Sequence, residues 1–127
     1  MGKKMIRIDA NVVLRFFIKD ILDQLFQAKN ILENENVLIT NEVIAEIIYV
    51  LEKIYKKRDY IYYALYKLII QRNILNFDKR FVLIALEIYK DTKLDFVDCL
   101  LCAYGEVDEI VTFDKKLIKC VDKIKKK

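Results

Sequence analysis

The sequence contains no histidine, serine, tryptophan or proline. Without histidine and serine, a Ser-His-Asp triad, a Cys-His dyad and a histidine-ligated zinc site are all excluded. The only glycines are Gly2 and Gly105, so neither the dinucleotide loop G-x-G-x-x-G nor the phosphate loop G-x-x-x-x-G-K can be written in this chain. The polar residues that remain for catalysis are mainly carboxylates, which prefer hard cations such as Mg²⁺.

Long apolar runs are also absent. Runs such as "FVLIAL" and "CLLCAY" are far shorter than the roughly 18 residues of a membrane-spanning helix. No apolar stretch of signal-peptide length follows the start of the chain. Hydrophobic residues nevertheless make up 55% of the 127 residues, which is ample for a folded core. We therefore expect a single globular domain over residues 1–127, working in the cytoplasm and away from membranes.

Cysteine is scarce, with three residues in the chain. Cys99 and Cys102 form a C-x-x-C inside an apolar helical stretch, and a metal site would need further ligands, of which only Cys120 is available. We interpret the cysteines as small buried apolar side chains. Free thiols of this kind suit a reducing compartment.

Strand-like and helix-like patterns alternate along the chain. Strands are predicted at residues 5–9, 36–40, 73–77 and 108–114, and helices at 12–17, 20–33, 41–57, from 59, 79–89, 95–104 and from 115. Asn11 and Asn41 are expected to cap helices, and Gly105 is expected to end one in a left-handed conformation. The alternation predicts the α/β class, as a three-layer α/β/α domain with a central, mostly parallel sheet.

Acidic residues stand where the predicted strands meet the following helices. Asp9 closes the first strand, Glu46 lies in the helix after the second, and Asp114 closes the last; Asp95 and Asp98 open the helix at 95. Ligand sites of open α/β sheets collect at this edge. Carboxylates gathered there repel one another unless a cation neutralises them. Mg²⁺ or Mn²⁺ would do so, and the predicted chemistry is hydrolysis of phosphate esters by an activated water.

Each acid also has a purely structural interpretation. Asp9 can be an ordinary helix-entry residue, Glu46 a solvated residue at the rim of its helix, and Asp114 the cap of the helix that follows it. Asp95 and Asp98 have the spacing of a capping box, although the neighbours of Asp98 one helical turn on are apolar.

Four short motifs resemble those of PIN-domain ribonucleases. In chain order they are "IDANVVLRF" with its Asp-x-Asn opening, "TNEVIAEIIYVL", "DFVDCLLCA" and "VTFDKK". Their order and spacing cover nearly the whole chain, and its small size is most similar to VapC-type toxins. The resemblance implies a Mg²⁺- or Mn²⁺-dependent endoribonuclease that is held inactive by an antitoxin protein and is usually a homodimer.

The resemblance also implies roles for individual residues. Asp9, Glu46, Asp98 and Asp114 become the catalytic and metal-binding acids, Asp95 an accessory carboxylate, and Asn11 and Thr112 residues that hold the acids by hydrogen bonds. The sequence departs from the family at Ala10, where threonine is common. That departure affects one local hydrogen bond and leaves the acids intact.

The net charge of +4 suits a polyanionic partner such as RNA. Lys115, Lys116 and Lys119 in the lysine-rich C-terminal segment are predicted to contact RNA phosphates, and "KIYKKR" (53–58) forms a second basic cluster. Lysine runs at chain ends can also serve solubility alone. Four tyrosines, at 60, 62, 63 and 66, crowd one helix, where they suit core packing, dimerisation or base stacking.

Other functions use the same residues. An RNA-processing or DNA-directed nuclease would have the same acids as a toxin. A PIN-like module that binds RNA or protein without cleaving is the alternative outside catalysis, and an intact set of acids argues against it.

Overall fold

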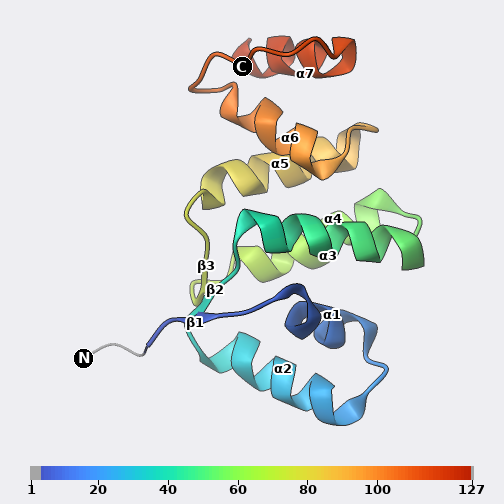
Figure 1. The fold of residues 1–127 in the computed structure, drawn as a ribbon, viewed down its shortest axis with the longest axis vertical. Helices are drawn as coiled ribbons and strands as arrows, with labels where there is room; N and C mark the ends of the chain where they lie inside the picture. Colours follow the sequence, from blue (N-terminus) through green and yellow to red (C-terminus); the bar gives the residue numbers. More distant parts are fainter. Residues whose placement is uncertain (1–3, 127) are drawn as a thin grey trace. The chain divides into compact units, whose positions relative to one another are not determined.

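The computed structural model describes residues 4–126. They fall into two compact units, residues 4–77 and 78–126. The described part of the chain contains three strands and seven helices (Figure 1). No helix in that part is both long and apolar enough to cross a membrane.

The first unit contains a three-stranded parallel sheet. Strands β1 (Ile6–Arg7), β2 (Val37–Leu38) and β3 (Ile74–Leu75) follow the order β1-β2-β3. The backbone N–H of Ile6 donates to Asn36 at 2.8 Å, and that of Val37 donates to Asn73 at the same distance. Both residues of β2 are buried, as expected for the central strand of a parallel sheet. Three of the four predicted strands are therefore confirmed, each shorter than its predicted range.

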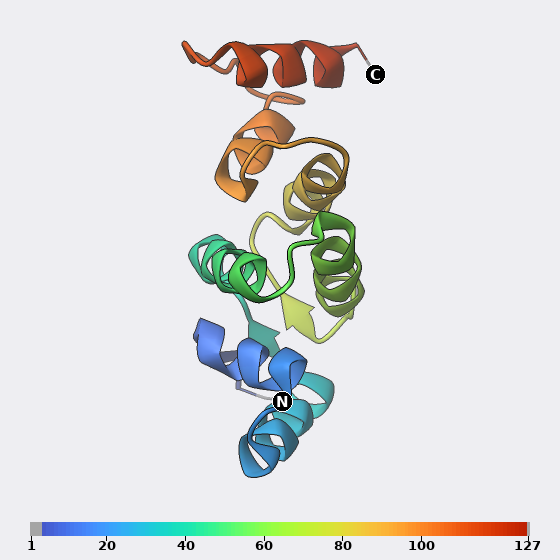
Figure 2. The same cartoon turned by 90° about the vertical axis from the view of Figure 1, so that its right-hand side faces the viewer.

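Two helical connections link these strands. Helices α1 (Ala10–Ile18) and α2 (Leu22–Asn34) join β1 to β2, and α3 (Asn41–Ile54) and α4 (Arg58–Ile69) join β2 to β3. Both crossovers run in the same direction along the sheet, so the right-handed rule puts all four helices on one face, as Figure 1 shows. Helix α1 packs against α2 and α3, and α3 packs against α4 (Figure 2).

Helix α3 shows why these segments are helical. Its residues Ile44, Ile47, Ile48 and Leu51 repeat at i, i+3, i+4 and i+7, and all are at most 2% exposed. Burying each such side chain stabilises the fold by about 1.5–3 kcal/mol. Truncating Ile47 to alanine would remove that contribution and leave a cavity, at a cost of roughly 2–5 kcal/mol.

The two asparagines predicted to cap helices do not do so. Thr40 caps α3 by accepting a hydrogen bond from the N–H of Val43, so Asn41 is the first helical residue. A threonine hydroxyl at this position reaches the free N–H groups of the first turn as well as an asparagine does. Helix α1 likewise begins at Ala10 after Asp9, which leaves Asn11 inside the first turn.

The second unit consists of three helices: α5 (Lys79–Asp91), α6 (Phe96–Tyr104) and α7 (Lys115–Lys125). Helix α6 packs against both α5 and α7 (Figure 2). The hydroxyl of Tyr104 donates to Asp78 Oδ2 at 2.6 Å, which ties the end of α6 to the start of α5. Leu117, Val121 and Ile124 of α7 form a buried cluster with Cys102 of α6.

The predicted strand 108–114 is not formed. Residues 109–114 have no regular structure, and the side chains of Val111 and Phe113 are 82% and 97% exposed. A strand needs a neighbouring backbone to bond with, and the described part of the second unit is helical apart from its connecting segments. The strand propensity of "DEIVTFD" is not sufficient to form a strand without such a partner.

The expected left-handed conformation of Gly105 is also wrong, because its φ and ψ are −60° and −14°. The glycine is needed for space instead. A Cβ at this position would lie 2.9 Å from the carbonyl oxygen of Cys102 and 3.1 Å from Cγ1 of Val121 on α7. Gly105 therefore lets α7 approach the end of α6.

The prediction of free cysteines is wrong for two of the three. Cys102 of α6 and Cys120 of α7 form a disulfide with a Cα–Cα distance of 6.1 Å, whereas Cys99 is buried and outside any disulfide. The packing of α7 on α6 brings together two cysteines separated by 18 residues, which their spacing in the sequence does not reveal. Closing a loop of this length stabilises the folded state by about 3 kcal/mol in the chain-entropy account.

Candidate carboxylate site

Asp9 lies at the carboxyl end of the sheet. It directly follows β1 and Ile8 in an extended conformation, and its side chain caps no helix N–H. Arg7 pairs with Leu38, so continuing this register by two residues puts Asp9 level with Thr40 on the neighbouring chain segment. This is the edge at which ligand sites of α/β sheets form. Among residues 4–126, the exposed side chain of Asp9 has no hydrogen bond or ion pair.

Glu46 lies on α3, whose N-terminus starts at the same edge. Its side chain is exposed, whereas Ile44 and Ile47 of the same helix are fully buried. Exposure fits the interpretation of Glu46 as a rim residue, and it also leaves the carboxylate accessible to a ligand. Within the described residues Glu46 forms no hydrogen bond or ion pair.

Sequence reasoning missed Asn76, a further polar residue at this edge. Its amide Nδ2 donates to the carbonyl of Ile39 at 2.8 Å and to Asn41 Oδ1 at 2.9 Å. Asn76 thereby fixes the end of β3 to the start of α3, the helix that carries Glu46. Its place near the carboxyl end of the predicted strand 73–77 matches that of Asp9 in the predicted strand 5–9, but its hydrogen-bond partners cannot be read from the sequence.

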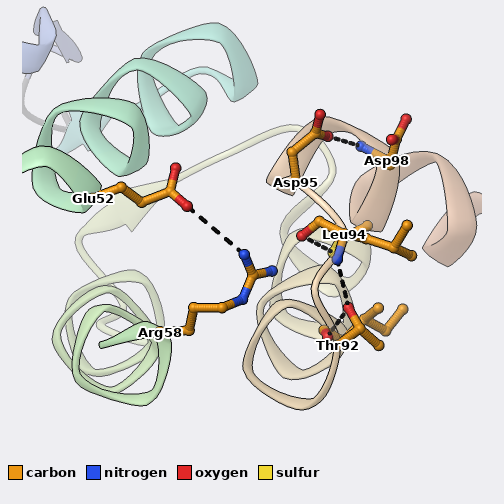
Figure 3. Close-up of polar contacts among 8 residues, drawn as sticks. Glu52, Arg58, Thr92, Leu94, Asp95 and Asp98 are labelled. Carbon is orange, nitrogen blue, oxygen red and sulfur yellow. Dashed lines mark hydrogen bonds and ion pairs between the residues drawn. The ribbon is translucent and has the colours of Figure 1, made fainter. Parts of the chain in front are cut away.

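Asp95 organises the start of α6 in the second unit. The Thr92 hydroxyl donates to the carbonyl of Ile88 and accepts from the N–H of Leu94, which orders the turn after α5. Asp95 Oδ1 then accepts a hydrogen bond of 2.8 Å from the N–H of Asp98 (Figure 3). The capping interpretation of Asp95 is therefore confirmed, and it leaves Oδ2 without a hydrogen bond to residues 4–126.

Asp114 performs the same function at α7. Its Oδ1 accepts from the N–H groups of Lys116 at 2.8 Å and Leu117 at 3.1 Å. Thr112 Oγ1 accepts from the N–H of Asp114 at 3.1 Å, which orients the residue from the preceding side. The capping interpretation of Asp114 is thus also confirmed. Both cap hydrogen bonds end on Oδ1, so Oδ2 takes no part in the cap.

Asp98 is the carboxylate whose surroundings oppose its charge most clearly. Burial raises the pKa of its carboxyl group, and the negative charges of Asp95 and Asp114 raise this pKa further. The three acids therefore share one electrostatic environment at the starts of α6 and α7. A divalent cation beside these acids would reverse the effect of their charges on this pKa.

Electrostatic coupling acts over longer distances than a metal–oxygen bond of about 2.1 Å. Within residues 4–126, no three or more Asp, Glu or Cys side chains are close enough together to hold a metal ion. Asp9 and Glu46 belong to the first unit, and Asp95, Asp98 and Asp114 belong to the second. The meeting of all these acids in one site stays a prediction.

The first unit also contains two cavities that none of the predicted acids lines. One of about 630 Å³ is lined mainly by apolar and aromatic side chains, with two lysines and Glu33. Its residues include Phe16, Phe17, Tyr55, Tyr60, Lys19 and Lys67. None of the predicted acids lines it, so its chemistry suits an apolar ligand group rather than a metal ion. A smaller cavity of about 230 Å³ is lined in part by Asn11. The role of Asn11 in holding the acids by hydrogen bonds stays a prediction.

Helix α7 presents a basic face to solvent. Leu117, Val121 and Ile124 are buried on one side, and the lysines lie on the other. The exposed lysines of the helix include Lys115, Lys116, Lys119 and Lys123. This separation is that of an amphipathic helix. The three lysines predicted to contact RNA are therefore accessible, and they begin directly after Asp114.

Comparison with known proteins gives one family match. The family described as "PIN domain" matches residues 6–123. No curated protein and no solved structure gives a significant match. With this match and the parallel sheet, the predicted fold class, a three-layer α/β/α PIN-like domain with a mostly parallel sheet, is confirmed.

Proposed function

Because this chain belongs to the PIN-domain family, whose members are generally nucleases, we propose that it is a metal-dependent endoribonuclease and the toxin of a toxin–antitoxin pair. The raised pKa of Asp98, caused by burial and then by Asp95 and Asp114, is the observation that most supports this. A divalent cation beside these carboxylates would offset the repulsion between their negative charges. Such a toxin would work in the cytoplasm, where its RNA substrate is.

In this proposal Asp9, Glu46, Asp98 and Asp114 hold Mg²⁺ or Mn²⁺. A bound ion would neutralise charge at the phosphodiester and would lower the pKa of an attacking water. Asp95 fixes the first turn of α6 by its hydrogen bond to the N–H of Asp98, and so orients the Asp98 carboxylate. Asp114 would act both as a helix cap and as a metal ligand. Its Oδ1 caps α7, and its Oδ2 remains for the ion.

The basic face of α7 supports RNA as the substrate. Lys115, Lys116 and Lys119 are exposed and follow Asp114 within two turns, so they would bind phosphates next to the acids. Replacing one of them with glutamine should weaken RNA binding without changing sequence preference, and should lower the slope of log affinity against log salt by about 1. Lys29 on α2, an exposed lysine that pairs with Glu33, is the control position.

The cavity of about 630 Å³ supports an antitoxin as partner. Its aromatic lining suits the apolar side chains of a bound segment, and Lys19 and Lys67 suit acidic residues beside them. A charge reversal at Lys67, Lys67→Glu, should weaken inhibition by the antitoxin encoded in a neighbouring reading frame while leaving RNA cleavage intact. Equal inhibition of this variant and the wild type would rule out the cavity as the docking surface.

Homodimerisation is part of the same proposal and is supported by α4. Tyr62 is buried in the core, whereas Tyr60 and Tyr63 are 58% and 65% exposed, so the tyrosine cluster has both a packing side and a free side. Exposed amphipathic aromatics are typical of interfaces. Light scattering should give twice the 15.2 kDa mass of the chain, and Tyr63→Glu should shift it toward the monomer.

Cleavage assays test the central proposal. With Mn²⁺ present, the wild type should cut structured RNA, and chelation should stop it. Asp9→Asn and Asp98→Asn should each lower the rate by roughly 100-fold or more, because each removes a metal ligand. Asp122→Asn, at an exposed acid of α7, should cut like the wild type.

The same assay separates the alternatives. Cleavage by both Asp9→Asn and Asp98→Asn at the wild-type rate would show the catalytic assignment to be wrong. RNA that is bound but not cut with any divalent ion would favour a binding module. Preferential cleavage of single-stranded DNA would favour a DNA-directed nuclease, and cleavage without growth arrest on expression would favour a processing enzyme.

A further inference from the structure

The cavity of about 230 Å³ lies between α1 and α2 of the first unit, two helices that pack against each other (Figure 1). Its lining comes from α1 with Asn11, Val12 and Arg15, and from α2 with Gln24, Gln27, Ala28 and Ile31. The four residues of α2 repeat at i, i+3, i+4 and i+7, so they form one face of that helix. This face of α2 therefore forms one wall of the cavity.

Three side-chain amides in the lining have no partner within residues 4–126. Asn11, Gln24 and Gln27 form no hydrogen bond with the described residues. Other amides of the same unit are engaged, since Asn73 and Asn76 donate to backbone carbonyls at 2.7–2.8 Å. Each amide has a donor and an acceptor side by side. The cavity thus collects hydrogen-bonding groups that are available to a ligand.

The lining is close to neutral. Arg15 is the only cation among the described residues that line the cavity, and its Nη1 donates to both carboxylate oxygens of Asp20 at 2.9 and 3.0 Å. No carboxylate of these residues lines the cavity. A phosphate group needs cations that are not already paired, and a divalent metal ion needs carboxylates. The lining therefore suits an uncharged ligand that forms hydrogen bonds.

The remaining lining residues are apolar. Ala28 is 3% exposed and has no side-chain atom beyond Cβ, which leaves space beside α2, and Val12 and Ile31 are partly buried. A flat ring can pack its face on such side chains while its edge reaches the amides. The volume is below the roughly 300–1,000 Å³ of cavities for drug-sized ligands. It therefore suits a single ring system.

We propose that this cavity binds one unpaired adenine of the RNA substrate, and that Gln24 and Gln27 select it by hydrogen bonds to its edge. This inference rests on the proposed function, which makes RNA the ligand. Proteins read RNA sequence mainly at unpaired bases, by packing against the ring and hydrogen bonding to its edges. Asn11 stands two residues after Asp9, at the start of α1. A base held here would therefore fix the position of the RNA relative to Asp9.

Adenine matches the lining better than the other bases do. Its N6 amino group and N7 acceptor form two hydrogen bonds with one glutamine or asparagine amide. Guanine is typically read by arginine and cytosine by a carboxylate, whereas Arg15 is bonded to Asp20 and the described lining has no carboxylate. Uracil, like thymine, presents an acceptor on the corresponding edge but no amino donor.

The test measures binding of the full chain to RNA in EDTA, so that cleavage plays no part. Fluorescence anisotropy compares a short labelled oligouridylate with the same oligonucleotide carrying one central adenosine. The wild type should bind the adenosine oligonucleotide roughly tenfold more tightly, as expected for one contact with two hydrogen bonds. Purine riboside in place of adenosine lacks the amino group and should remove this preference.

Variants of α2 locate the preference. The double variant Gln24→Leu, Gln27→Leu removes both amides at exposed positions and should bind the two oligonucleotides alike. Asn30→Leu makes the same kind of change at an exposed position of α2 outside the lining, and it should keep the full preference. Lys115→Gln should weaken binding of both oligonucleotides equally, because a phosphate contact does not distinguish bases.

Adenosine 5′-monophosphate distinguishes a free nucleotide from RNA as the source of the base. It should displace the oligonucleotide only at concentrations far above the dissociation constant of the oligonucleotide, because the described lining offers its phosphate no cation besides the paired Arg15. Displacement at concentrations below that constant would overturn RNA as the occupant of the cavity.

The outcomes distinguish this inference from the proposed function. Equal affinity of the wild type for the two oligonucleotides, with Mn²⁺-dependent cleavage intact, would overturn the adenine site and leave the nuclease standing. A loss of preference in Asn30→Leu as large as in the double variant would also overturn the site. Selective binding that the double variant loses, without cleavage at any Mn²⁺ concentration, would support the site and overturn the proposed nuclease.

Discussion

Asp95 accepts a hydrogen bond of 2.8 Å from the N–H of Asp98, and the charge of the same Asp95 adds to the effect of burial in raising the pKa of the Asp98 carboxyl. One side chain therefore stabilises the first turn of α6 and disfavours the ionised form of its neighbour. These two effects are separable by mutation, because the first depends on a hydrogen-bond acceptor and the second on charge.

Removing the charge of Asp98 should stabilise the protein in the absence of metal. The folded state raises the pKa of Asp98, so folding favours the protonated form of this carboxyl group. The resulting contribution to stability is complete below the ordinary aspartate pKa and is lost as pH rises through the pKa of the folded state. Asp98→Asn cannot ionise and keeps the backbone N–H that Asp95 binds. At pH 7 it should therefore exceed the wild type by a few tenths of a kcal/mol, a small gain because partial exposure screens the charges.

Thermal unfolding in EDTA at several pH values measures this effect. The advantage of Asp98→Asn should shrink as pH falls and vanish at about pH 3, where aspartate is protonated in both states. Asp122→Asn serves as the control, because its carboxylate is exposed on α7. An Asp98→Asn protein that is less stable than the wild type at pH 7 would contradict the prediction.

Divalent metal should reverse the order of these two proteins. A ligand that binds only the folded state stabilises it by about 2.7 kcal/mol at a concentration 100 times its dissociation constant. Adding Mn²⁺ at that excess over the wild-type dissociation constant should raise the melting temperature of the wild type and leave that of Asp98→Asn nearly unchanged. Repeating the scan with Ca²⁺ compares the shift in melting temperature caused by Mn²⁺ with that caused by a larger ion of the same charge. Equal shifts of wild type and variant in Mn²⁺ would exclude Asp98 as a ligand.

The two functions of Asp95 are separated by two substitutions. Asp95→Ala removes the cap of α6 and should lower the free energy of unfolding by about 1 kcal/mol. Asp95→Asn keeps an oxygen that can accept from the N–H of Asp98 and should cost much less, while lowering the pKa of Asp98. Chemical denaturation gives both free energies. Equal losses in the two variants would show that charge, and not the cap, is what Asp95 contributes to stability.

The sequence predicted the helices and the parallel strands because these depend on patterns within a few residues. The i, i+3, i+4 repeat of Ile44, Ile47 and Ile48 is legible without any tertiary information. The acid caps at Asp95 and Asp114 were legible for the same reason, as single residues before a helical pattern.

What depends on contacts distant in the sequence was predicted less well. The segment 108–114 has a strand pattern, but a strand also needs a partner, which a pattern does not specify. The pairing of Cys102 with Cys120 depends on how α7 packs on α6. Asn76 was missed because its role consists of hydrogen bonds to Ile39 and Asn41, residues more than thirty positions earlier in the chain.

Gly105 offers the clearest test of close packing between α6 and α7. Its φ of −60° suits any residue, so Gly105→Ala should gain about 0.4–1 kcal/mol from reduced freedom of the unfolded chain. The new Cβ would, however, lie 2.9 Å from the Cys102 carbonyl oxygen and 3.1 Å from Cγ1 of Val121. We expect the clash to outweigh the gain, with a net loss of roughly 1–2 kcal/mol in the free energy of unfolding.

A double-mutant cycle with Val121→Ala measures how much of that loss comes from α7. Val121→Ala alone should destabilise the protein, because it removes a buried side chain. Combined with Gly105→Ala, the shortened side chain leaves space for the new Cβ, so the double variant should lose less than the sum of the single losses. Additive losses would mean that the cost of Gly105→Ala arises at the Cys102 carbonyl within α6, and that α7 does not depend on the glycine for its approach.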